Sequence, residues 1–86
     1  MAVSDQDLTD LAADELAQAI SLHWRELIKV TPWGDTYQAL APGGEEVEVE
    51  RNYLWFKDPG GDVMCEVTAR HGEREAQAFG VVRRPE

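Results

Sequence analysis

The chain has 86 residues, of which 17 are acidic and 8 are basic, so its formal net charge is −9. A surface of this charge repels the phosphates of nucleic acids and the anionic headgroups of membranes, which argues against direct binding of either. The hydrophobic fraction of 43% and the charged fraction of 29% are typical of globular proteins. We expect residues 1–86 to form one small domain.

The cysteine content and the N-terminal residues bear on the compartment. Cys65 is the only cysteine, so the chain cannot form an internal disulfide. The segment Met1–Asp7 has neither the basic nor the apolar part of a secretory signal peptide. Apolar runs such as Leu54–Phe56 are far too short to span a membrane. These features predict a cytoplasmic protein.

The first expected element is a helix over residues 5–30. Ser4 is a favourable N-cap, and Asp7 three residues later completes an approximate capping box. Beyond it, residues recur at the three- and four-residue spacing of one helix face. The stripe consists of Leu8, Ala12, Leu16, Ala19, Ile20, His23 and Leu27. Pro32 ends the helix, because proline lacks an N–H group and disfavours helical geometry at Thr31.

Beyond the helix, the pattern changes to the alternation of β-strands. The expected strands are residues 35–41, 45–57, 62–70 and 74–83, separated by turn sequences that contain glycine. Short connections make consecutive strands antiparallel neighbours. The sequence therefore predicts an α+β fold, in which an N-terminal amphipathic helix packs on a three- to four-stranded antiparallel meander sheet.

The second expected strand begins with a charged face. Glu46, Glu48 and Glu50 alternate with valines, a pattern typical of the solvated face of an edge strand. Three carboxylates on one face repel each other, so we expect Arg70 or Arg74 on a neighbouring strand to compensate them.

The same strand ends apolar on both faces. Leu54 and Phe56 continue the glutamate face, and Tyr53 and Trp55 continue the valine face. A β-bulge near Arg51 or a second contact over Leu54 and Phe56 would account for this change.

Few residues suggest chemistry. His23 lies in the apolar stripe, where a structural core histidine is more common than a buried general base. Cys65 alternates with valines, so its thiol is expected to point inward and to be unreactive. The spacing of His23, Cys65 and His71 does not match a metal-ligand pattern. We therefore predict no catalytic residue, no metal and no cofactor.

The apolar content, with three tryptophans, is high for so short a chain. It favours a small acidic non-enzymatic protein-interaction module, such as a regulator, adaptor or accessory subunit, which binds a protein partner or a second copy. The expected interaction residues are Trp33, Leu54 and Phe56 as apolar anchors, and Glu46, Glu48 and Glu50 as a charged rim.

Two alternative functions remain open at the level of sequence. The first is an acidic inhibitor that mimics a nucleic acid and binds a basic protein. The second is a small ligand-binding or enzyme fold with a helix–sheet cavity around His23.

Overall fold

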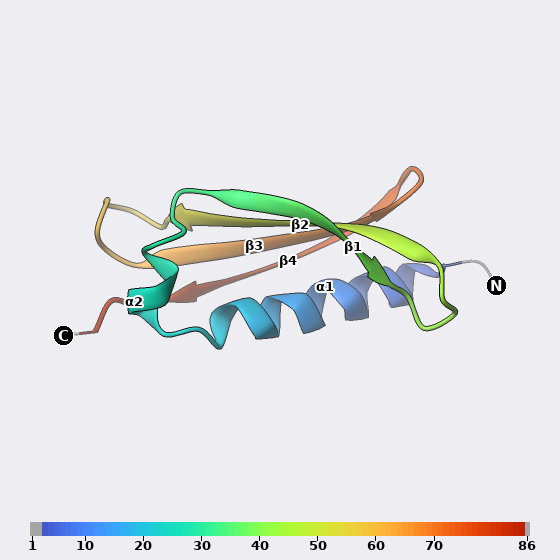
Figure 1. Ribbon diagram of the computed structural model, residues 1–86, viewed down its shortest axis with the longest axis horizontal. Coiled ribbons are helices and arrows are strands. Elements are labelled where there is room, and N and C mark those ends of the chain that lie inside the picture. Colours follow the sequence, from blue (N-terminus) through green and yellow to red (C-terminus); the bar gives the residue numbers. More distant parts are fainter. Residues whose placement is uncertain (1–2, 86) are drawn as a thin grey trace.

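The computed structural model describes residues 3–85, which form two helices and four strands (Figure 1). In chain order these are α1 (Asp5–Ile20), α2 (Trp24–Leu27), β1 (Gly34–Leu40), β2 (Glu46–Trp55), β3 (Val63–His71) and β4 (Arg74–Val82). The strands form one antiparallel sheet in the order β1-β2-β3-β4. The predicted α+β arrangement, a helix on a meander sheet, is confirmed. The expected domain also includes residues 1–2 and 86, which lie outside the described residues.

The start of α1 follows the sequence signals. The Ser4 hydroxyl oxygen accepts a hydrogen bond of 3.0 Å from the Asp7 N–H, and the Asp7 carboxylate accepts one of 3.0 Å from the Ser4 N–H. This reciprocal capping box satisfies two backbone donors at the helix start. Leu8, Ala12 and Ala19 are buried against the sheet, as the stripe predicts.

The single helix expected over residues 5–30 is wrong beyond Ile20. The Ser21 hydroxyl donates to the Gln18 carbonyl at 2.6 Å, and His23 Nδ1 accepts from the Arg25 N–H at 3.2 Å. Such bonds from side chain to backbone compete with helical ones. After this break α2 turns toward the sheet, where Leu27 is fully buried and Trp24 donates to the Gly61 carbonyl at 2.8 Å.

A four-residue turn follows α2. It comprises Val30–Trp33 and is closed by a hydrogen bond of 2.7 Å from the Trp33 N–H to the Val30 carbonyl. The Thr31–Pro32 peptide bond within it is cis. The Trp33 carbonyl then accepts from the Tyr53 N–H at 2.9 Å, which joins this turn to β2.

The sheet has two different faces. On the helix face, α1 packs against β3 and β4, and small side chains on β4 allow its close approach. These small residues are Ala76, Ala78 and Gly80. The opposite face, which we call the open face, is left bare by the helices (Figure 1). Because α1 packs on β3 and β4, the edge strand β1 is only partly covered on the helix face, where Tyr37 and Ala39 are half-buried against the core.

Strand β2 corrects two expectations. Its pairing with both β1 and β3 is continuous through Arg51, so the proposed β-bulge is wrong. It is also an interior strand rather than an edge strand. The apolar end of β2 on the open face has apolar neighbours on the adjacent strands. Leu54 pairs with Met64 of β3, which pairs with Val81 of β4.

Candidate interaction surface

One half of the open face is acidic. Arg70 on β3 lies 3.0 Å from Glu50, 3.0 Å from Glu75 and 3.5 Å from Glu48. This confirms that a neighbouring arginine compensates the glutamates of β2. A hydrogen bond from the Asn52 amide, together with the Arg70 guanidinium, lowers the pKa of Glu50.

The compensation is incomplete. Four glutamates share this part of the face, namely Glu46, Glu48, Glu50 and Glu75, and we call them the acidic half. Only Arg70 is paired with them among residues 3–85. The other expected arginine, Arg74, instead contacts the Asp5 carboxylate at 3.2 Å and the Val3 carbonyl. The acidic half therefore keeps a negative charge.

The other half of the open face is mainly apolar, with Glu66 of β3 beside Phe79 as a charged neighbour. Leu54, Met64 and Val81 lie in one row across three strands, and Phe79 lies in the next row. We call these four residues the open-face patch. Phe79 is 72% exposed and Val81 is 39% exposed, so water contacts aromatic and aliphatic surface here. Phe79 is absent from the expected interaction residues, although its alternation with Gln77 and Val81 places it on this face.

The three expected apolar anchors do not share one surface. Leu54 belongs to the open-face patch, and Phe56 lies two residues beyond it, 44% exposed, with the Lys57 ammonium 5.6 Å from its ring. Trp33 is 71% exposed but lines a hollow with Tyr53, whose side chain is on the helix face. These three residues therefore do not form one continuous apolar surface.

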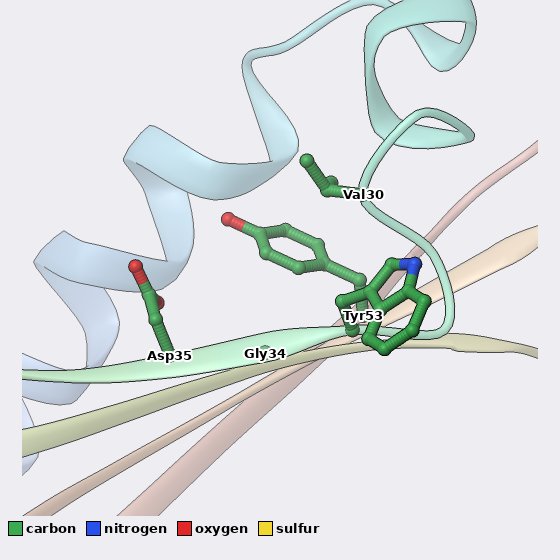
Figure 2. A pocket seen from close by; sticks show the side chains of 5 residues that line it. Val30, Gly34, Asp35 and Tyr53 are labelled. Atoms are coloured by element: carbon green, nitrogen blue, oxygen red, sulfur yellow. The ribbon is translucent and has the colours of Figure 1, made fainter.

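The hollow beside Trp33 has a volume of about 130 Å³. It is lined by Val30, Trp33, Gly34, Asp35 and Tyr53, and we call it the Trp33 hollow. Figure 2 shows that the side chains of Val30, Asp35 and Tyr53 stand on the same side of the strands as α1.

A buried polar cluster borders this region. Arg51 of β2 donates to Glu15 of α1 at 3.1 Å, to the Tyr37 hydroxyl at 2.8 Å and to the Tyr53 hydroxyl at 3.3 Å. Burial raises the pKa of Tyr37. Burial opposes the charge of Arg51, but its hydrogen bonds with the two tyrosines outweigh burial and raise its pKa. The Nε atom of Arg51 is buried without a hydrogen-bond partner among the described residues.

The sequence contains a signal for this cluster. Glu15 falls between Ala12 and Ala19 on the buried face of α1, and Arg51 falls between inward-facing Val49 and Tyr53 of β2. A carboxylate and a guanidinium at two such positions indicate a buried ion pair, because an unpaired charge is rarely buried.

The candidate chemical residues lie apart. His23 was expected in the core stripe, and this is wrong: it is exposed and caps α2. Cys65 is fully buried, as predicted, and burial raises the pKa of its thiol. Across the part of the chain that the structure describes, no group of three or more His, Cys, Asp or Glu side chains is placed to hold a metal ion.

Comparison of the chain with family models, with curated proteins and with solved structures gives no match. Within residues 3–85, neither helix has the length and apolar character that crossing a membrane requires.

Proposed function

We propose that this protein is a non-enzymatic interaction module that binds a basic partner protein through the open face of its sheet. The observation that carries the proposal is the division of that face into the open-face patch and the acidic half. Exposed aromatic and aliphatic groups supply affinity when a partner covers them. Neighbouring charges orient the partner and speed the encounter.

The charge of the face indicates the chemistry of the partner. The acidic half contains four glutamates, and Arg70 is the arginine paired with them. The whole chain has a formal net charge of −9. A partner that presents apolar side chains flanked by Lys or Arg complements this face. A cytoplasmic regulator, adaptor or accessory subunit fits this description. A second copy fits less well, because two acidic halves repel each other.

Phe79 offers the most direct way to weaken the interaction. Its side chain is 72% exposed in the isolated chain, so its replacement removes little packing from the fold. Complete burial of such a side chain contributes about 1.5–3 kcal/mol. We therefore expect Phe79→Ser to weaken binding at least about tenfold.

Affinity capture from an extract of the native host, followed by binding of each purified candidate, tests the proposal. The wild type and a Leu22→Ser control are expected to bind the same basic protein. Leu22 is also exposed, at 43%, but lies in the link between the helices. Phe79→Ser is expected not to capture this partner. The affinity of the wild type for the partner is expected to fall as the salt concentration is raised.

Two outcomes would overturn the proposal. One is binding of every captured protein by Phe79→Ser as strongly as by the wild type. The other is a dimer in sedimentation velocity experiments that Phe79→Ser dissociates, which would assign the open face to a second copy.

A further inference from the structure

We propose that the Trp33 hollow binds the side-chain ammonium group of a lysine on a partner protein. The hollow lies on the helix face at the β1 edge, whereas the open-face patch lies on the opposite face. The inference goes beyond the proposed function and does not depend on it.

The size of the hollow suits one side chain. Its volume of about 130 Å³ corresponds to roughly four water molecules at about 30 Å³ each. Pockets for whole small molecules and cofactors are larger, about 300–1,000 Å³. The end of a lysine side chain, with its methylene stem, is therefore a better match than a complete metabolite.

The charges around the hollow favour a cation. Asp35 is exposed, and its side chain makes no hydrogen bond or ion pair that the described part of the chain provides. Arg51 lies opposite Asp35 in the β1–β2 pairing, but its guanidinium is balanced by Glu15 at 3.1 Å. These three side chains together carry one net negative charge, and Asp35 is one of the residues that line the hollow.

The remaining lining favours an alkyl stem ending in an ammonium group. The Trp33 indole and the Tyr53 ring supply aromatic surface, and Val30 supplies aliphatic surface. An ammonium group is attracted to the electron-rich face of an aromatic ring, most strongly to tryptophan. A guanidinium is recognised best by paired acceptors, whereas Asp35 is the only carboxylate in this lining. Lysine is therefore the preferred residue.

The hollow is already formed in the isolated chain. The Trp33 backbone is held on both sides, by the bond of its N–H to Val30 and the bond of its carbonyl to Tyr53. Tyr53 is itself 7% exposed and bonded to Arg51. Fixing the backbone and the Tyr53 ring in advance lowers the cost of ordering when a ligand binds.

An NMR titration tests the inference. The ¹⁵N-labelled protein is titrated with the capped peptide acetyl-Ala-Lys-Ala-amide, with its Nζ-acetylated form and with the arginine analogue. We expect the lysine peptide to shift the amides of Gly34 and Asp35 and the indole N–H of Trp33. Acetylation removes the charge and is expected to weaken binding about fivefold.

Matched variants distinguish binding in the hollow from non-specific electrostatic attraction of the peptide to an acidic protein. Asp35→Asn and Trp33→Ala are each expected to weaken the lysine peptide about threefold or more. Asp14→Asn removes one exposed carboxylate on α1 and is expected to leave the affinity for the lysine peptide unchanged. Phe79→Ser is also expected to leave this binding intact, so the two surfaces are tested separately.

The inference is overturned by equal affinity for the lysine and acetyl-lysine peptides, or by an arginine peptide that binds as tightly as lysine. An Asp14→Asn effect as large as that of Asp35→Asn would also overturn it, because attraction would then follow net charge alone. Thermal unfolding of each variant confirms that a lost signal does not reflect a lost fold.

Discussion

Arg51 of β2 and Glu15 of α1 form an ion pair of 3.1 Å that joins the helix to the centre of the sheet. On β2, Arg51 lies between Val49 of one apolar cluster and Tyr53 of the other. On α1, Glu15 lies between Ala12 and Ala19 of the same two clusters. The core is therefore divided by a polar contact that also borders the Trp33 hollow.

The first prediction concerns this ion pair. Glu15→Ala leaves the guanidinium of Arg51 buried without its carboxylate and is expected to lower the free energy of unfolding by about 2–4 kcal/mol. The double variant Glu15→Leu with Arg51→Met, which removes both charges, is expected to recover most of this loss. Urea unfolding measures the free energy of unfolding of both variants. A loss of less than about 0.5 kcal/mol in Glu15→Ala would contradict a structural role for the pair.

The second prediction compares two glycines in strands. A Cβ atom at Gly34 would lie 2.6 Å from the Arg51 carbonyl oxygen and would also collide with the Asn52 side chain. Gly34→Ala must therefore displace the start of β1 and is expected to cost about 1–3 kcal/mol. A Cβ atom at Gly80 meets Ile20 at an ordinary contact distance of 3.6 Å. Gly80→Ala is expected to be neutral or stabilising by up to about 1 kcal/mol.

Thermal unfolding of these two alanine variants gives the comparison. An equal change in melting temperature for Gly34→Ala and Gly80→Ala would be inconsistent with close contact at the start of β1.

The third prediction concerns pH. The pKa of Glu50 is lowered in the folded state by the Asn52 amide and by Arg70. The ionised carboxylate therefore stabilises the fold above its unfolded pKa of about 4.3, and this contribution is lost as pH falls through the lower folded pKa. Glu50→Gln is expected to be less stable than the wild type at pH 7, and the difference is expected to vanish near pH 3.

Circular dichroism melting curves between pH 7 and pH 3 measure this difference. Glu46→Gln serves as the control, because Glu46 lies on the same strand face but has no ion pair among the described residues. A difference between wild type and Glu50→Gln that does not change with pH would rule out the assigned contact.

The fourth prediction concerns the thiol of Cys65. The side chain is fully buried, and burial raises its pKa, so the reactive thiolate is both rare and inaccessible. Ellman's reagent at pH 8 is expected to react only as fast as the chain opens, and rapidly in denaturant. Since Cys65 is the only cysteine, the absorbance reports this site alone. Rapid reaction of the folded protein would place the thiol at the surface.

Local signals in the sequence predict several elements correctly. The Ser4 and Asp7 capping box forms within four residues, and the inward position of Cys65 follows from strand alternation. The break after Ile20 was not predicted, because Leu27 continues the three- and four-residue spacing of α1 while lying in a different helix. Its burial results from tertiary packing against the sheet, which periodicity does not report.

The sequence predicts the proposed interaction surface only in part. Alternation places Leu54 and the glutamates on one face, but it does not say whether a strand lies at the edge or inside the sheet. The open-face patch depends on Met64 and Phe79 of two other strands, which become neighbours of Leu54 only through the pairing of β2, β3 and β4. Strand order and register therefore decide which exposed side chains form a surface.

The measurement that tests the central claim most directly is a map of NMR amide shifts in the ¹⁵N-labelled protein as the captured partner is added. We predict that the largest shifts fall on the open face, at Leu54, Met64 and Val81 and at the glutamates of β2. Shifts confined to the outer surface of α1, at residues such as Asp10 and Asp14, would contradict the assignment of the open face as the interaction surface.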